Sequence, residues 1–369
     1  MDFWREKMDN KLLVAREKIN EIDKEMRMLF IERMKASELV AEYKQEHGLE
    51  ILDPIREAEV IRRNSESVEN DVYREYYVNF LKSTMALSRA YQARLLTGMR
   101  VAYSGTEGAY AHIAASKLFP TAKTIGYGSF DEAYSAVENG ECDVAVLPIE
   151  NSYNGDVGQV SDLMFSGPLY VNKVTELKIS HDLLAPKGTR IEDINTVISH
   201  PQALGQCHKY IVDHGYSEME FVNTALAAKY VADSNAKSLA AIASADAASI
   251  FGLEVLATNI NESSLNTTKF AVFSRSENKN SITDKRVHTI LLFTVRHEAG
   301  ALAKALNVIA KYGFNMGSLR SRPMKELLWQ YYFYIEVEGN LDSEDGKAMM
   351  SELKKHCDRV KTVGSYTVV

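Results

Sequence analysis

Residues 9–47 read DNKLLVAREKINEIDKEMRMLFIERMKASELVAEYKQEH, and they contain neither glycine nor proline. Apolar side chains recur along this stretch at heptad positions, namely Leu12, Ile19, Ile22, Met26 and Leu29. The pattern predicts a single helix of roughly forty residues, about 55–60 Å long, that ends at Gly48. A helix of that length needs a partner along its side, most simply a second subunit.

Among the cations from Arg16 to Lys44, three have no acidic partner on the helix. Residues three and four apart are neighbours on a helix, and Arg16, Arg33 and Lys44 have no Asp or Glu at either spacing. Arg33 also occupies a heptad position at which an apolar residue is expected. Carboxylates of another helix can satisfy such charges, or the arginine stems can extend to water. The alternative is that the three cations bind an anionic ligand.

Two further helical segments follow the long helix. Asp53 and Pro54 supply an N-cap and a first-turn proline for one of them. A third helical pattern covers about residues 70–96. Other polar side chains lie on these segments: Arg56, Glu57, Ser88 and Gln92. Together with the unpaired cations they form a set of groups that would bind a small dicarboxylate.

From residue 100 the sequence changes to short apolar runs, such as VAYSG, DVAVLPIE, INTVISH and KFAVFSR. Helical patterns such as AYAHIAASKLF and TALAAKYVADS lie between several of them. This alternation predicts an α/β fold with a largely parallel sheet, and its length suits two lobes with a cleft between them. The polar stretch at 275–286 predicts a linker. Residues 287–369 then have the β-α-β-β-α-β order of a small domain.

Three polar clusters stand at the ends of predicted strands, where open α/β sheets bind ligands. They are PIENSYNG (148–155), SHPQALGQC (199–207) and NTTKF (266–270). Pro201 predicts a helix start, whose free backbone N–H groups near Ser199 and His200 would attract a carboxylate. The same residue types are also common in turns and caps, and we interpret His200 as a loop or cap residue rather than a general base.

The composition disfavours several classes of partner. The formal net charge is −7, which argues against a nucleic-acid or anionic-membrane surface. No stretch approaches the ~20 apolar residues of a membrane span. Three scattered cysteines and nine histidines show no spacing typical of a metal site, so no metal is expected. The charged N-terminus and the cysteine pattern indicate a reduced, cytoplasmic setting.

Residues 9–97 resemble the all-helical, intertwined-dimer type of chorismate mutase. The resemblance rests on AREKI, ER, Lys44, DPIRE and SRAYQ. It implies that three arginines hold the carboxylates of chorismate, the first of them from the partner subunit: Arg16, Arg33 and Arg56. It implies that two side chains face the breaking ether oxygen: Lys44 and Gln92. It implies that three others order the substrate hydroxyl and the cations: Asp53, Glu57 and Ser88.

Residues 100–274 resemble prephenate dehydratase through PIENS, SHPQALGQC and NTTKF. The resemblance implies two lobes like those of a periplasmic binding protein, with the active site in the cleft. It implies that Thr268 donates a proton to the leaving hydroxyl, and that five residues bind prephenate: Glu150, Asn151, Ser199, Gln206 and Lys269. Lys269 replaces the arginine usual in the family, and an ammonium group cannot grip a carboxylate bidentately.

Residues 287–369 resemble an ACT domain, a small ligand-sensing module. The resemblance rests on EAGALAKAL and RSRP and implies L-phenylalanine as an inhibitory effector bound between two such domains. The implied ligand residues are Gly300, Ala301, Leu302, Ser321, Arg322 and Pro323. Arg320 stands where the family usually has an acidic residue.

The order of the segments matches the bifunctional chorismate mutase–prephenate dehydratases. We therefore predict an all-α intertwined-dimer domain (1–97), a two-lobed α/β domain (100–275) and a ferredoxin-like α+β domain (287–369). The enzyme would convert chorismate to prephenate and prephenate to phenylpyruvate without a cofactor, as a homodimer or higher oligomer. One alternative is a mutase fused to a dehydrogenase, which would need a GxGxxG motif where the chain has only GTEG. Another is a binding protein without chemistry.

Overall fold

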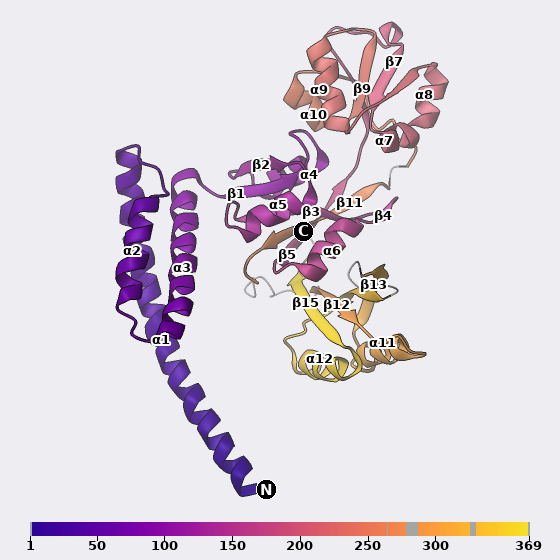
Figure 1. The fold of residues 1–369 in the computed structure, drawn as a ribbon. Helices are drawn as coiled ribbons and strands as arrows, with labels where there is room; N and C mark the ends of the chain where they lie inside the picture. The colour runs from indigo at the N-terminus through magenta and orange to yellow at the C-terminus, as the bar shows by residue number, and fades with distance from the viewer. Residues whose placement is uncertain (1, 264, 278–286, 325–329, 368–369) are drawn as a thin grey trace. The chain divides into compact units, whose positions relative to one another are not determined.

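The computed structural model describes residues 2–263, 265–277, 287–324 and 330–367. The chain divides into two compact units, residues 1–98 and residues 99–369 (Figure 1). The helices of the first unit are α1 (Asp2–Glu46), α2 (Pro54–Glu66) and α3 (Asp71–Thr97). The predicted long helix is thus confirmed as α1. Within this unit, α2 and α3 lie beside the C-terminal half of α1, while its N-terminal half extends beyond them (Figure 1).

The extended half of α1 exposes an apolar face. Five side chains at the predicted heptad positions are between 44% and 64% exposed: Leu12, Ile19, Ile22, Met26 and Leu29. Exposed apolar surface of this extent marks a site of association. Met26 and Leu29 line a cavity with side chains of α2 and α3, yet all five side chains stay at least 44% exposed in the described part of the first unit.

Local sequence signals explain where the helices begin and end. Gly48 has φ +62° just after α1, a left-handed conformation that glycine adopts without a steric penalty. The Asp53 side chain accepts a hydrogen bond from the backbone N–H of Arg56 at 2.9 Å and caps α2. These signals confirm the predicted boundary between the first two helices.

The second unit begins with an α/β subdomain whose sheet has the order β2-β1-β3-β11-β5, with β4 paired to β3. Its strands are β1 (Arg100–Ser104), β2 (Lys123–Tyr127), β3 (Val144–Asn151), β4 (Gly155–Asp156), β5 (Tyr170–Lys178) and β11 (Thr267–Ser274). Its helices are α4 (Tyr110–Leu118), α5 (Phe130–Glu138) and α6 (Gly158–Ser166). We call this part the first α/β subdomain.

A second α/β subdomain lies in the chain between β5 and β11. Its sheet has the order β10-β6-β9-β7-β8. Its strands are β6 (Asp182–Ala185), β7 (Thr196–Ser199), β8 (Ser217–Glu220), β9 (Leu239–Ala243) and β10 (Glu254–Ala257). Its helices are α7 (Pro201–Gln206), α8 (His208–His214), α9 (Thr224–Ser234) and α10 (Ala245–Phe251), with a 3₁₀ turn at Ile191–Asp193.

Both sheets are mixed, which corrects the prediction of a largely parallel sheet. β1 pairs in parallel with β2 and β3, but β11 runs antiparallel to both β3 and β5. In the second sheet, β6 runs antiparallel to β9 and β10. The chain leaves the first sheet along β5 and returns along β11, where Thr267 pairs with Lys178. A strand that leaves and a strand that returns at the same edge must run in opposite directions.

The C-terminal domain has the predicted β-α-β-β-α-β order. Its elements are β12 (His288–Thr294), α11 (Ala301–Lys311), β13 (Asn315–Pro323), β14 (Tyr331–Glu338), α12 (Glu344–His356) and β15 (Arg359–Tyr366), and its sheet order is β13-β14-β12-β15. One face of this sheet packs on α11 and α12. The other face shares a hydrophobic core with the first α/β subdomain, in which Leu292 and Tyr334 join Met164 and Val171. Most of the predicted linker at 275–286 lies outside the described residues.

Among the helices of the described residues, none is both long and apolar enough to cross a membrane.

Candidate active sites

Arg33, the seam cation of α1, contacts α3 rather than an acidic residue. Its Nη1 donates to the Ser88 hydroxyl and, at 3.5 Å, to the Thr84 carbonyl. Ser88 is buried, with 4% of its surface exposed. Within the described part of the chain, no carboxylate pairs with Arg33. A protein carboxylate from the same chain therefore does not account for this cation.

Gln92 lies one turn beyond Ser88 on α3. It is 7% exposed, and its Oε1 is buried without a hydrogen-bond partner in the described chain. An unpaired buried polar group costs about 1–3 kcal/mol. The Gln92 amide is therefore available to a ligand. Lys44, near the end of α1, donates from Nζ to the Ile51 carbonyl at 2.5 Å, which holds the turn before α2.

The other predicted residues of the helical unit have partners of their own. Arg56 pairs with Glu59 at 2.7 Å on an exposed face of α2. Asp53 serves as the N-cap of that helix. Glu57 forms an ion pair with Arg89 of α3. Arg89 was not predicted, because its partner lies on another helix and sequence spacing does not reveal such a pair.

Arg16 is exposed and lies on the extended half of α1. Arg33 is seventeen positions away on the same helix, which corresponds to about 25 Å at 1.5 Å per residue. One chain therefore brings Arg33, Ser88 and Gln92 together but leaves Arg16 apart from them.

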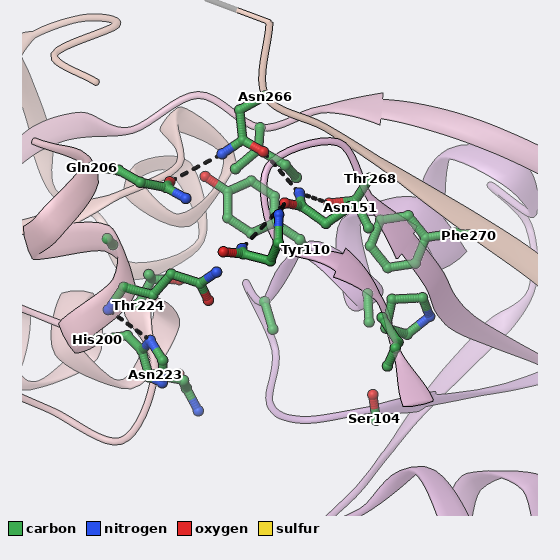
Figure 2. Close-up of a pocket in the computed structure, with 18 of the residues that line it drawn as sticks. Ser104, Tyr110, Asn151, His200, Gln206, Asn223, Thr224, Asn266, Thr268 and Phe270 are labelled. Atoms are coloured by element: carbon green, nitrogen blue, oxygen red, sulfur yellow. Dashed lines mark hydrogen bonds between the residues drawn. The ribbon is translucent and has the colours of Figure 1, made fainter. Parts of the chain in front are cut away.

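The second unit contains a cavity of about 440 Å³ between the two α/β subdomains (Figure 2). The first subdomain contributes lining residues that include Tyr110, Asn151 and Thr268, and the second contributes His200, Gln206 and Asn223. His181 and Asn266 lie on the two segments that connect the subdomains. We call this cavity the cleft.

Thr268 is held at the cleft by Asn151. The two residues face each other on adjacent strands, β11 and β3, and Asn151 Nδ2 donates to Thr268 Oγ1 at 2.9 Å (Figure 2). Asn151 Oδ1 accepts bonds from the backbone N–H groups of Tyr153 and Asn154 at 3.0 and 2.9 Å, which fixes the amide orientation. Because Oγ1 acts as the acceptor here, the Thr268 hydroxyl proton is free to point at a ligand.

Gln206 is oriented by two donors. Its Oε1 accepts from Asn266 Nδ2 at 3.0 Å and lies 2.8 Å from His181 Nε2 (Figure 2). An amide oxygen cannot donate, so His181 carries its proton on Nε2. Burial lowers the pKa of His181, although the bond to Gln206 partly opposes this shift. The Gln206 NH₂ group, which has no acceptor in the described chain, is thereby left for a ligand.

Helix N-termini, rather than cationic side chains, are the groups at the cleft that favour an anion. No lysine or arginine is among the described residues that line it, and Asp156 is the one Asp or Glu among them. The N-terminus of α4 at Ala109 has no side-chain cap and lines the cleft. The N-terminus of α9 also reaches it, at Asn223 and Thr224. Free N–H groups at such ends favour a carboxylate.

Three of the predicted prephenate-binding residues lie outside the cleft lining. Ser199 is fully buried and donates to the Ile242 carbonyl at 2.6 Å. Glu150 and Lys269 pair with each other at 3.4 Å, and Glu150 also pairs with Arg320 of the C-terminal domain. The β3–β11 register shifts between Lys269 and Phe270. This bulge lets Pro148 and Asn151 both face the cleft while Glu150 points away from it.

The predicted effector residues occupy two separate places on the C-terminal domain. Gly300, with φ +81°, precedes α11, and Leu302 lines a surface cavity with Arg296, His297 and Phe333. Ala301 is the first residue of α11. Ser321, Arg322 and Pro323 lie on β13 and are not part of that cavity lining. The Arg322 side chain instead pairs with Asp162 of α6 at 3.1 Å.

The structure adds cleft residues that were not predicted as site residues, namely Tyr110, His181, Asn223 and Asn266. Asn266 stands in the NTTKF run, so the motif offered a signal for it. Tyr110 stands in the predicted helical run AYAHIAASKLF, which assigned it no role at a site. Its hydroxyl lies 3.3 Å from His181 Nδ1, a contact between distant parts of the sequence that no local pattern reveals. Among the described residues, no group of His, Cys, Asp and Glu is arranged to hold a metal ion.

Two protein families match the chain. The family described as type II chorismate mutase matches residues 15–93, and the family described as prephenate dehydratase matches residues 101–278. A bifunctional chorismate mutase/prephenate dehydratase from Neisseria gonorrhoeae is 32% identical over 362 residues, which cover 97% of this chain and 98% of that protein. An arogenate dehydratase from Petunia hybrida is 37% identical over 73% of this chain and 71% of its own.

A solved structure resembles the second unit. The prephenate dehydratase from Arthrobacter aurescens, in complex with L-Phe, superposes with a TM-score of 0.67 at 25% identity and covers 73% of this chain and 90% of its own. Fold and sites thus define an enzyme that joins an isomerase domain to a lyase domain. The chain belongs to the family of bifunctional chorismate mutase/prephenate dehydratases, and it serves the biosynthesis of phenylalanine.

Proposed function

We propose that the helical unit rearranges chorismate to prephenate as an intertwined homodimer. The observation that carries this proposal is Arg33, which has no carboxylate partner in the described chain and contacts Ser88, one helical turn from the buried, unbonded Gln92 Oε1. The exposed apolar face of α1 supports a second subunit along the helix. Such a subunit would bring its own Arg16 to the site, since Arg16 of the same chain is too far away.

The proposed chemistry needs no acid, base or nucleophile. In a Claisen rearrangement one carbon–oxygen bond breaks while one carbon–carbon bond forms, and negative charge develops on the ether oxygen. Arg16, Arg33 and Arg56 would hold the substrate carboxylates and fold the molecule for reaction. Lys44 and the Gln92 amide would stabilise the developing charge. Asp53, Glu57 and Ser88 would orient the substrate hydroxyl and the cations.

We propose that the cleft converts prephenate to phenylpyruvate. The observation that carries this proposal is the Thr268 hydroxyl, which faces the cleft and accepts a hydrogen bond from Asn151. In this reaction the ring loses its carboxylate as carbon dioxide, and the electrons of that bond expel the ring hydroxyl as the ring becomes aromatic. Thr268 would protonate the departing hydroxide to water and regain its proton from solvent. While Thr268 lacks its proton, the Asn151 amide would stabilise the negative charge on Oγ1.

Recognition of prephenate would use dipoles and neutral donors. The uncapped α4 and the start of α9 supply N–H groups for the carboxylates, and Gln206 supplies its free NH₂ group. The two subdomains would close on the substrate as the lobes of a periplasmic binding protein do. Three of the predicted residues would support the cleft wall without contacting the substrate, namely Ser199, Glu150 and Lys269.

We propose further that the C-terminal domain is a ferredoxin-like ACT domain that binds L-phenylalanine and inhibits the dehydratase. The βαββαβ order and the left-handed Gly300 before α11 support this assignment. The solved relative from Arthrobacter aurescens holds L-Phe. Because Leu302 and Arg322 do not share a cavity within one chain, the effector site would form between two such domains. Three free cysteines, two of them buried, fit a reducing cytoplasm.

One coupled assay tests the proposal. Purified full-length protein should convert chorismate to phenylpyruvate without added NAD or metal, and L-phenylalanine should slow the second step. Accumulation of prephenate alone would refute the dehydratase assignment. A flat response to L-phenylalanine would refute the sensor assignment and leave both catalytic assignments in place.

A further inference from the structure

Arg320 extends from β13 of the C-terminal domain into the first α/β subdomain. Its two terminal nitrogens bind different carboxylates: one pairs with Glu150 of β3, and the other with Asp156 of β4 at 3.0 Å. The Arg320 side chain is 17% exposed, and its guanidinium carbon lies 5.0 Å from the centre of the Tyr334 ring. An arginine buried to this extent between two carboxylates stabilises the structure more than an exposed surface ion pair does.

Glu150 lies outside the cleft lining, whereas Asp156 is part of it. β4 pairs with β3 so that Glu150 faces Asp156 and Asn151 faces Gly155. Glu150 therefore precedes the residue that holds Thr268, while Asp156 itself lines the cleft. Glu150 also pairs with Lys269 at 3.4 Å, and Lys269 follows Thr268 in the chain. Arg320 thus binds β3, which presents Asn151, and β4 beside it. It is linked to β11, which presents Thr268, through the Glu150–Lys269 pair.

Removing this cation would leave like charges close together. Arg322 helps to neutralise the group, since it pairs with Asp162 at 3.1 Å and with the other Asp156 oxygen at 3.6 Å. Glu336, which is 4% exposed, adds a further buried acid near Lys269, with 3.9 Å between the charged atoms. Without Arg320, Glu150 and Asp156 would repel across the β3–β4 pair. The loop from Tyr153 to Val157 would then lose its fixed position at the cleft.

We propose that Arg320 is a positioning residue for the dehydratase, through which the C-terminal domain holds Thr268, Asn151 and the Asp156 loop in their reactive arrangement. This inference rests on the dehydratase function proposed above for the cleft. It also gives the charge at position 320 a purpose, because an acidic side chain there would face two other acids. Arginine suits the position because its planar fork presents one terminal nitrogen to each carboxylate in a fixed geometry, whereas a lysine would have to serve both from a single nitrogen.

The test compares variants of the full-length chain below their unfolding temperatures. Arg320→Gln should lower dehydratase kcat about tenfold, as misplacement of a reacting group does, with unchanged mutase activity. Arg320→Lys should stay closer to Arg320→Gln than to the parent. In a Glu150→Gln background, the further loss on Arg320→Gln should be smaller than in the parent, because one of the two repelling acids is gone.

Arg359→Gln is the matched control. Arg359 is another cation at the same domain contact, with its guanidinium carbon 4.6 Å from the centre of the Phe165 ring, but it touches neither Glu150 nor Asp156. This variant should keep kcat within about twofold of the parent. Parent-like kcat in Arg320→Gln, an equal loss in Arg359→Gln, or full rescue by lysine would each overturn the inference. Thr268→Ala serves as the reference: if it retains dehydratase activity, the proposed cleft itself fails, independently of Arg320.

Discussion

The helical unit and the α/β cleft differ in how much of an active site one chain supplies. In the helical unit, Arg33 has no carboxylate partner, the Gln92 amide is unbonded and α1 exposes an apolar face. In the cleft, Asn151, Thr268 and Gln206 already belong to a closed hydrogen-bond network. On our proposal, the first site is completed by a second subunit and its substrate, whereas the second is organised before its substrate arrives.

This difference shows why the two sites leave different traces in a sequence. A site shared between subunits leaves polar groups that no neighbour in the same helix satisfies, as with Arg16 and Arg33. A site built within one chain leaves polar motifs at strand ends, as with Asn151 and Thr268. If the two sites are independent, a substitution that impairs one activity should leave the other unchanged.

The largest effect is expected for Thr268→Ala. Loss of a general acid costs about 10²–10⁴ in rate, so dehydratase kcat should fall by that range while mutase activity stays unchanged. Steady-state assays with chorismate and with prephenate measure both. Thr267→Ala, one residue earlier on the same strand, is the matched control and should retain dehydratase activity. Equal loss of both activities in Thr268→Ala would break the comparison, because it would show one shared site.

The second-largest effect is expected from a charge on the exposed apolar face of α1. It should lower mutase activity and leave dehydratase activity unchanged. Ile22→Glu places a carboxylate on a side chain that is 45% exposed in one chain, that would be buried in a dimer and that is not a helical neighbour of Arg16. We expect a smaller species in solution and a mutase rate about 10²-fold lower, since the partner's Arg16 would be lost. Dehydratase activity should persist. Light scattering and both assays measure this, with Lys24→Glu as the control off the heptad face. A fully active monomeric mutase would disprove the shared site.

His181→Asn tests whether the cleft is organised in advance. Without the donor at Nε2, the Gln206 amide can turn over and present its oxygen to the substrate carboxylate. We expect KM for prephenate to rise about tenfold, the worth of one charge-assisted hydrogen bond, with a smaller change in kcat. His208→Asn, at a side chain that is 66% exposed, is the control. An unchanged KM would show that Asn266 alone orients Gln206.

The smallest effect concerns pH. Burial lowers the pKa of His181 in the folded protein, so the unfolded chain binds more protons below its own histidine pKa of about 6.5. The free energy of unfolding therefore decreases as the pH falls below that value. Above it, His181 is neutral in both states and no longer lowers the stability. Denaturant midpoints of dehydratase inactivation at pH 7.5 and 5.5 should differ less in His181→Asn than in the parent. Parallel profiles would contradict this assignment.

Much of the fold followed from local rules. Gly48, Asp53 and Pro54 place the break between the first two helices, because each acts on its immediate backbone. The mixed first sheet was not predictable in the same way. β11 inserts between β3 and β5 only after the chain has built a whole second sheet, and no local pattern records that pairing.

The site was predictable where a motif residue points into the cleft. Thr268, Asn151 and Gln206 line it, whereas Glu150 and Lys269 face the C-terminal domain instead. Neighbouring residues of a strand point to opposite faces, so alternation along β3 and β11 separates Glu150 and Lys269 from Asn151 and Thr268. The motifs alone did not make that distinction. His181 was missed since its importance comes from one contact with Gln206, a residue on a different element.

The pairing of Lys178 with Thr267 has a consequence for how the protein folds. Everything between these two residues is an insertion whose ends meet at neighbouring positions of one sheet. The insertion has its own strands and core, so it can fold before β11 joins the interrupted sheet. Pairing β11 with β3 and β5 joins segments that are distant in the sequence, and such long-range pairing forms slowly. Thr268 lies on β11, so we expect dehydratase activity to return only after that strand has paired, later than the insertion's own structure forms.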